Sequence, residues 1–180
     1  MLSMVPVNLR SFRLKVRRYK KKMRSFLTRL EKNAPKKLDE WIVEADKAVW
    51  KETDCLSCAN CCKTMSPTFT PADIRRISSH FNLTPAAFKT KFLMKDIDGD
   101  WLNVKQPCQF LDLSTNMCSI YEIRPADCAG FPHLTRKKAK QYMPTHSQNV
   151  AYCPATFKMV EKMMVMVNLN GHKLYNTIKS

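Results

Sequence analysis

Eight cysteines are the side chains of this sequence best suited to chemistry, and four of them fall within the segment CLSCANCC at residues 55–62. Two residues separate Cys55 from Cys58, and two separate Cys58 from Cys61, so that a tight turn can aim each pair of sulfurs at one ion. Cys62 directly follows Cys61, and neighbouring side chains usually diverge. The segment therefore predicts two neighbouring metal sites or one multinuclear cluster with shared thiolates.

The other four cysteines lie downstream and are too far apart along the chain to form a site alone, so we expect them to fold back onto residues 55–62. The predicted metal ligands are Cys55, Cys58, Cys61, Cys62, Cys108, Cys118, Cys128 and Cys153, with His133 as a candidate nitrogen ligand. Thiolates select zinc, copper(I) or iron–sulfur clusters, and eight can hold two zinc ions or one zinc and one cubane cluster. Buried free thiols and a disulfide framework are the alternatives.

The positive charge of the chain is concentrated near its beginning. The net charge is +16, and the segment from Arg10 to Lys37 holds thirteen basic residues and a single acidic one, Glu31. Apolar residues recur there at alternating spacings of three and four, which predicts an amphipathic helix. Its apolar stripe could pack on the protein's own core. Its charges could instead bind RNA or a ribosome, and a membrane surface or transit peptide is a third alternative.

The remaining sequence favours a mostly α fold with short irregular β segments. A second helix is expected near residues 38–49, a helical hairpin over residues 71–94 and a last helix from Pro154, with extended pieces at 101–105 and 108–112. The hairpin helices are predicted from the sequences Thr70-Pro71 and Thr84-Pro85, because Thr caps a helix and Pro suits its first turn. We therefore predict a basic helical arm over residues 1–35, a metal-organised cysteine domain over 36–170 and a tail over 171–180.

Several classes of protein are disfavoured by composition. The sequence has no apolar run of about 18 residues and no secretory leader, so we expect a cytoplasmic protein. Three glycines are too few for a glycine-rich phosphate loop or a dinucleotide-binding fingerprint. Between a binding module and an enzyme, these features favour the binding module.

Four stretches of the sequence together resemble the YkgJ-type cysteine-cluster family, described as a zinc- or iron-chelating domain. They are CLSCANCC, TPADIRRIS, PCQFLD with MCSIYEIRPADC, and CPATFKMVEK. The resemblance implies that the cysteines chelate metal in a small, mostly α domain. The family commonly has Arg after the cysteine numbered 128 here, where this sequence has Ala129.

Three functions are compatible with these observations. The first is a zinc- or iron-binding module whose basic arm contacts an anionic partner. The second is an enzyme with an iron or iron–sulfur centre for redox or methyl transfer. This alternative is suggested by some flagellin lysine methylases, which have a similar cysteine block. Its candidate polar groups are Tyr121, Glu122, Arg124 and Asp127. The third is a metal chaperone or store.

Overall fold

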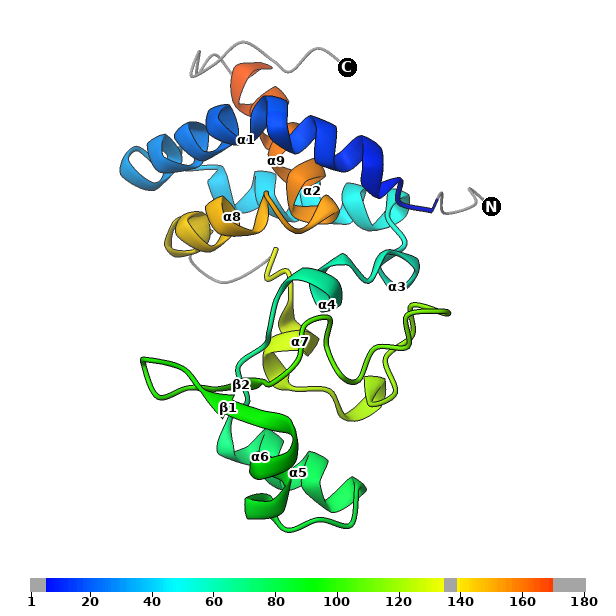
Figure 1. Ribbon diagram of the computed structural model, residues 1–180. Coiled ribbons are helices and arrows are strands. Elements are labelled where there is room, and N and C mark those ends of the chain that lie inside the picture. The colour runs from blue at the N-terminus through cyan, green and yellow to red at the C-terminus, as the bar shows by residue number, and fades with distance from the viewer. Residues whose placement is uncertain (1–5, 135–138, 170–180) are drawn as a thin grey trace. The chain divides into compact units, whose positions relative to one another are not determined.

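The computed structural model describes residues 6–134 and 139–169 as two compact units (Figure 1). Of the described residues, the first unit comprises 6–58, 132–134 and 139–169, and the second comprises 59–131. Helices predominate over strands in both units, and one short two-stranded sheet is the only sheet among the described residues. The predicted mostly α fold is therefore confirmed. The predicted tail, residues 171–180, lies outside the described residues, and the domain boundaries at 35 and 36 stay a prediction.

The described residues of the first unit form three long helices and three short ones. They are α1 (Leu9–Lys32), α2 (Leu38–Glu52), α3 (Cys55–Cys58), the 3-10 helix η2 (Ala139–Tyr142), α8 (Met143–Asn149) and α9 (Pro154–Leu169). The side chain of Asn8 caps α1 by accepting a hydrogen bond from the amide of Ser11. This cap satisfies one of the amides that a helix start leaves without an intrahelical partner.

The apolar stripes of these helices form the core of the first unit. Helix α1 packs against α8 and α9, and α2 packs against α9. Phe12 of α1 meets Phe157 of α9 edge to face, with ring centroids 5.8 Å apart. The predicted second helix is confirmed as α2, and five of its residues form a buried apolar stripe: Leu38, Trp41, Ile42, Ala45 and Val49. Met159 and Met163 of α9 are also buried, as core-filling residues.

The second unit has short helices around a small sheet. It contains α4 (Asn60–Thr64), α5 (Pro71–His80), α6 (Pro85–Phe92), β1 (Leu93–Lys95), β2 (Trp101–Asn103), the 3-10 helix η1 (Tyr121–Ile123) and α7 (Ala126–Gly130). The strands are antiparallel, with Met94 opposite Leu102. A cluster of buried apolar residues holds the unit together: Phe69, Ile74, Ile77, Phe88, Leu93, Phe110 and Ile120.

Both Thr-Pro helix starts are confirmed, but the predicted extents of the neighbouring elements are partly wrong. Thr70 and Thr84 cap α5 and α6 as expected. However, α6 ends at Phe92 and not at residue 94, because Leu93 pairs with Asn103 across the sheet. The predicted extended piece at 108–112 reduces to one isolated bridge between Leu111 and Cys118. The short helices α3, α4, α7 and α8 have no signal in the hydrophobic periodicity, because each is too short to show one.

Candidate metal centre

The cysteine segment 55–62 is divided between the two units. Cys55 and Cys58 lie on α3 in the first unit, whereas Cys61 and Cys62 lie on α4 in the second. The residue at the division is Ala59, which is buried and has a left-handed backbone with φ of +44°. A left-handed conformation costs a residue with a Cβ roughly 1–2 kcal/mol. The four neighbouring cysteines therefore belong to two different structural groups, which the spacing alone could not establish.

Four thiols of the second unit come from four different elements. Cys62 lies on α4, Cys108 in a turn after β2, Cys118 at the isolated bridge and Cys128 on α7. The amide of Cys108 donates a hydrogen bond to the carbonyl oxygen of Cys62 at 2.8 Å. The isolated bridge between Leu111 and Cys118 holds the segment of Cys118 beside the residues that follow Cys108. Segments far apart in the sequence thus carry these cysteines into one unit.

The four thiols also interact electrostatically, each with the other three. Burial raises the pKa of Cys128 to about 12, and the neighbouring thiols add to the rise. Burial likewise raises the pKa values of Cys108 and Cys118. By contrast, a hydrogen bond with Cys61, whose Sγ lies 3.9 Å from that of Cys62, lowers the pKa of Cys62 to about 7. Such a group resists ionisation until a cation compensates the clustered negative charge.

Hydrogen-bond donors point at two of these sulfurs. The Nδ2 of Asn103 donates to the Sγ of Cys108 at 3.3 Å, and the amide of Phe110 donates to the same thiol. The amide of Ile120 donates to the thiol of Cys118. In both cases the donor amide belongs to the residue two positions after the cysteine. Donors of this kind stabilise the thiolate form and orient ligand sulfurs around a metal. The surroundings of Cys108 and Cys118 therefore suit anionic sulfur.

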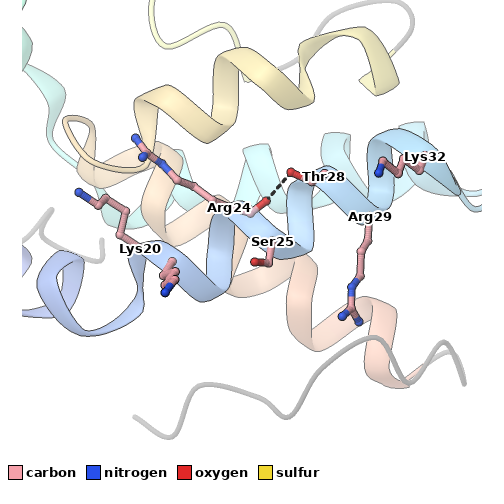
Figure 2. Close-up of a pocket in the computed structure, with 7 residues that line it drawn as sticks. Lys20, Arg24, Ser25, Thr28, Arg29 and Lys32 are labelled. Atoms are coloured by element: carbon pink, nitrogen blue, oxygen red, sulfur yellow. Dashed lines mark hydrogen bonds between the residues drawn. The ribbon is translucent and has the colours of Figure 1, made fainter.

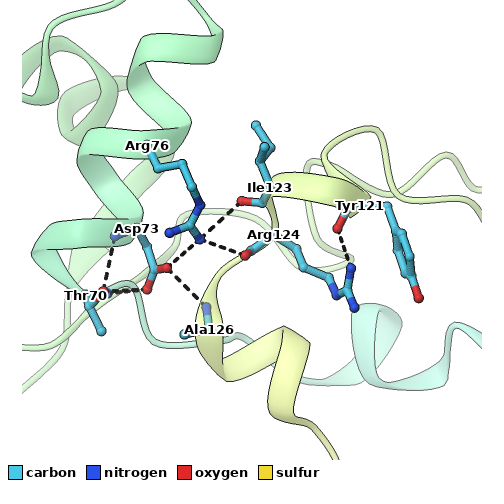
Figure 3. A network of polar contacts seen from close by, with 7 residues as sticks. All are labelled: Thr70, Asp73, Arg76, Tyr121, Ile123, Arg124 and Ala126. Atoms are coloured by element: carbon cyan, nitrogen blue, oxygen red, sulfur yellow. Dashed lines mark hydrogen bonds and ion pairs between the residues drawn. The ribbon is translucent and has the colours of Figure 1, made fainter.

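A buried carboxylate holds the segment that leads to Cys128 (Figure 3). Asp73, only 1% exposed, closes the capping box of α5 and also accepts a hydrogen bond from the amide of Ala126 at the start of α7. Arg76 pairs with Asp73 at 2.7 Å and donates to the carbonyl oxygen of Arg124 at 2.9 Å. Burial opposes ionisation of the Asp73 carboxyl group, but its hydrogen bonds with Thr70 and Arg76 outweigh this effect and lower its pKa. This residue thus fixes the approach to Cys128.

A second polar contact supports the turn that carries Cys108. The side chain of Gln109 donates to the Oδ1 of Asn103 at 2.8 Å and to the carbonyl oxygen of Phe92 at 2.9 Å. It thereby orients the amide group that donates to the Cys108 sulfur. The sequence alone did not indicate that Asp73, Asn103 or Gln109 would support the cysteines. The position of Gln109 directly after Cys108 is a signal for that residue, whereas Asn103 lies five positions before Cys108 and has no such signal.

Three cysteines belong to the first unit, namely Cys55, Cys58 and Cys153. Cys55 and Cys58 lie three residues apart on α3, and Cys153 directly precedes α9, where the amide of Thr156 donates to its Sγ at 3.5 Å. Burial raises the pKa of Cys153 to about 11, and Cys55 is among the groups that contribute to this rise.

An anchor between α9 and the end of α2 places these cysteines near one another. The Nζ of Lys158 donates to the carbonyl oxygen of Glu52 at 3.0 Å and to the Oγ1 of Thr53 at 3.2 Å. Lys162 pairs with the carboxylate of Glu52 at 2.9 Å. The first turns of α9 therefore lie beside the residues that immediately precede Cys55.

The ligand set is not assembled as it stands. Within residues 6–134 and 139–169, no three His, Cys, Asp or Glu side chains are close enough together to hold an ion. His133 lies in the first unit with a left-handed backbone, φ +56°, and interacts electrostatically with the buried His146. Its role as a ligand stays a prediction, as does that of each cysteine.

The candidate polar groups between Cys118 and Cys128 make structural contacts. The guanidinium of Arg124 lies 3.9 Å from the centroid of the Tyr121 ring and also donates to the Tyr121 carbonyl oxygen (Figure 3). A carboxylate oxygen of Asp127 accepts a hydrogen bond from the amide of Thr68 at 3.2 Å. These contacts fix the local backbone, which is the ordinary structural role of such residues.

A helical protein whose second unit gathers thiols in this way has the donor chemistry of a zinc or iron site. Residues 54–153 match the CxxCxxCC family, whose description is "Putative zinc- or iron-chelating domain", and the chain belongs to this family. The family description supports metal binding by this chain, with zinc or iron as the metal. Neither a curated protein nor a solved structure matches the chain. Among the described residues, no helix has the length and apolar character needed to cross a membrane.

Proposed function

We propose that this protein is a zinc- or iron-binding module in which Cys62, Cys108, Cys118 and Cys128 hold one ion within the second unit. The observation that carries this proposal is the mutual electrostatic interaction of four thiols from four separate elements. Four thiolates satisfy a tetrahedral structural site, and the ion would neutralise their charge. The donors to Cys108 and Cys118 support the same assignment, because they favour thiolates over thiols.

A second thiol group in the first unit completes the proposal. Cys55 and Cys58 share one turn of α3, and Cys153 approaches them through the anchor between α9 and the end of α2. Three thiolates leave a tetrahedral ion with an open position, which His133 of the same unit or a water molecule could fill. We therefore expect two metal equivalents per chain, held by two separate groups of cysteines.

The test is metal content after anaerobic purification, measured by elemental analysis on the full-length protein. Replacing Cys108, Cys118 and Cys128 by Ser should remove one equivalent, and replacing Cys55, Cys58 and Cys153 should remove the other. The matched controls Ser119→Ala and Ser57→Ala alter a neighbour of each group and keep every thiol, so they should retain both equivalents. Unchanged metal content in both cysteine variants would refute the proposal.

An absorption spectrum of the same samples distinguishes the functional alternatives. A colourless protein with two zinc ions supports a structural module. Visible charge-transfer bands together with bound inorganic sulfide would favour the iron–sulfur alternative, with redox or methyl-transfer chemistry. Metal that exchanges freely with a chelator in the folded protein would instead favour the chaperone or store, because an exchangeable ion requires accessible thiolates.

A further inference from the structure

We propose that the outward face of α1 is a docking surface for the phosphate backbone of double-helical RNA. This basic face is defined by the exposed residues Arg10, Arg13, Arg17, Arg18, Lys21 and Lys32. At 3.6 residues per turn, these side chains fall within about 140° of the helix circumference. Their charges are concentrated on one side of a helix about 36 Å long, since α1 has 24 residues and each rises about 1.5 Å.

Little negative charge neutralises this face from within its own unit. Helix α1 carries one acidic residue, Glu31, and no acidic residue in its first turn. The ion pair of α1 with α9 joins Lys15 to Glu161 at 3.9 Å, and Lys15 is not a member of the basic face. Arg24 is only partly exposed and is not a member of the basic face; it donates to the carbonyl oxygen of Ser147 in α8. The field of these charges attracts a polyanion.

The opposite side of α1 argues against a membrane as the partner. A helix that lies in a membrane surface inserts an apolar face into the lipid. The apolar face of α1 is instead buried in the first unit, where Met23, Phe26 and Leu27 are at most 1% exposed. Leu14 is the one large apolar side chain of α1 that is exposed, and a single leucine gives little insertion energy. A partner that binds through charge alone fits better.

The side chains beside the basic face favour double-helical RNA over other nucleic acids. Single strands bind through aromatic rings that stack on bases, but the phenylalanines of α1 are buried and Tyr19 is half-buried. Asn and Gln, which read bases in the major groove of DNA, do not occur within α1. Figure 2 shows Lys20, Arg24, Arg29 and Lys32 of the same helix with Ser25 and Thr28 between them. Such hydroxyl groups suit an RNA duplex, which is recognised through phosphates and 2′-hydroxyls.

The experiment measures binding of the metal-loaded full-length protein to a fluorescent 24-base-pair RNA duplex (about one residue of α1 per base pair) across a salt series. Six phosphate contacts predict a slope of log affinity against log salt of about −5. The variant Arg10→Ala/Arg17→Ala/Lys21→Ala should weaken binding about a hundredfold near 0.1 M salt and reduce the slope by about 2 to 3. Because these side chains are exposed, its melting temperature and metal content should match those of the wild-type protein.

The control is Lys47→Ala/Lys51→Ala/Lys140→Ala, which removes the same charge from exposed positions of the same unit outside α1. It should bind the duplex within a few fold of the wild-type affinity. An equal loss in both variants would overturn the proposal, because it would reflect net charge and not the basic face. Tighter binding to single-stranded RNA, to a DNA duplex of equal sequence or to anionic phosphatidylserine vesicles would also overturn it.

Discussion

Metal binding to the second unit should release several protons, and their number follows from the surroundings of each sulfur. The ordinary pKa of a cysteine thiol here is 9.0, and the pKa values of Cys108, Cys118 and Cys128 are all raised above it. These three thiols are therefore protonated at pH 8, whereas Cys62, with a pKa of about 7, is mostly ionised. Four metal-bound thiolates then require the release of about three protons at pH 8 and about four at pH 6.

Proton release makes the apparent metal affinity strongly dependent on pH. Each released proton changes the affinity tenfold per pH unit, so zinc affinity should rise about a thousandfold from pH 7.5 to 8.5. Isothermal titration calorimetry in buffers of different protonation enthalpy counts the protons directly. The Cys128→Ser variant should release about one proton fewer at pH 8, and the Ser119→Ala control should match the wild-type protein. Release of one proton or none would refute the four-thiol assignment.

Three further perturbations test the scaffold. Asp73→Ala should destabilise the protein by about 3 kcal/mol in urea denaturation, because it removes the capping box of α5, the ion pair with Arg76 and the acceptor of the Ala126 amide. A loss below about 1 kcal/mol would contradict this role. Burial lowers the pKa of His146 from 6.5 to about 4, and the charge of the neighbouring His133 adds to this shift. As pH falls, the imidazole of His146 is therefore protonated in the unfolded state before it is protonated in the folded state. Stability should therefore drop by about 3 kcal/mol between pH 6.5 and 4, and His146→Phe should flatten this part of the profile, since neither ring nitrogen has a hydrogen-bond partner among the described residues. Ala59→Gly should leave the melting temperature unchanged or raise it, because glycine adopts the left-handed backbone without strain. The control Ala48→Gly within α2 should lower the melting temperature by the equivalent of about 1 kcal/mol. Equal losses in the two variants would show that the backbone at Ala59 is not strained.

Local patterns in the sequence were sufficient to predict most of the long helices. The stripe of α2 and the Thr-Pro starts of α5 and α6 depend on contacts within a few residues, which periodicity and capping rules describe. The end of α6 was missed because the pairing of Leu93 with Asn103 is a contact between residues ten apart in the chain. Tertiary pairing of this kind overrides local propensity.

The grouping of the cysteines was out of reach for the same reason. Chelate spacing treats Cys58 and Cys61 as one pair, yet the backbone reverses its handedness at Ala59 and the two cysteines belong to different units. Likewise, Cys62 and Cys108 are brought together by a backbone hydrogen bond across 46 positions of sequence, 62 to 108. The sequence could therefore identify the chemistry of the donor set but not which thiols share an ion.

The two units should respond differently to loss of metal, because they bury different amounts of apolar surface. The second unit spans 73 residues, from 59 to 131, with seven residues in its buried cluster and no disulfide. Domains of this size commonly need a metal or disulfide for stability. The first unit has three helices of 15 to 24 residues with interlocking apolar stripes, so it should keep its fold without an ion.

Hydrogen–deuterium exchange read by mass spectrometry tests this difference. After anaerobic treatment with a strong chelator, peptides from α5 and α6 should exchange as fast as an unfolded chain, because coordination then no longer offsets the loss of conformational entropy. Peptides from α1, α2 and α9 should remain protected, which controls for general unfolding by the chelator. Restoring zinc should return the protection of α5 and α6. Equal loss of protection in both units would contradict the reasoning, and so would unchanged protection of α5 and α6 in the metal-free protein.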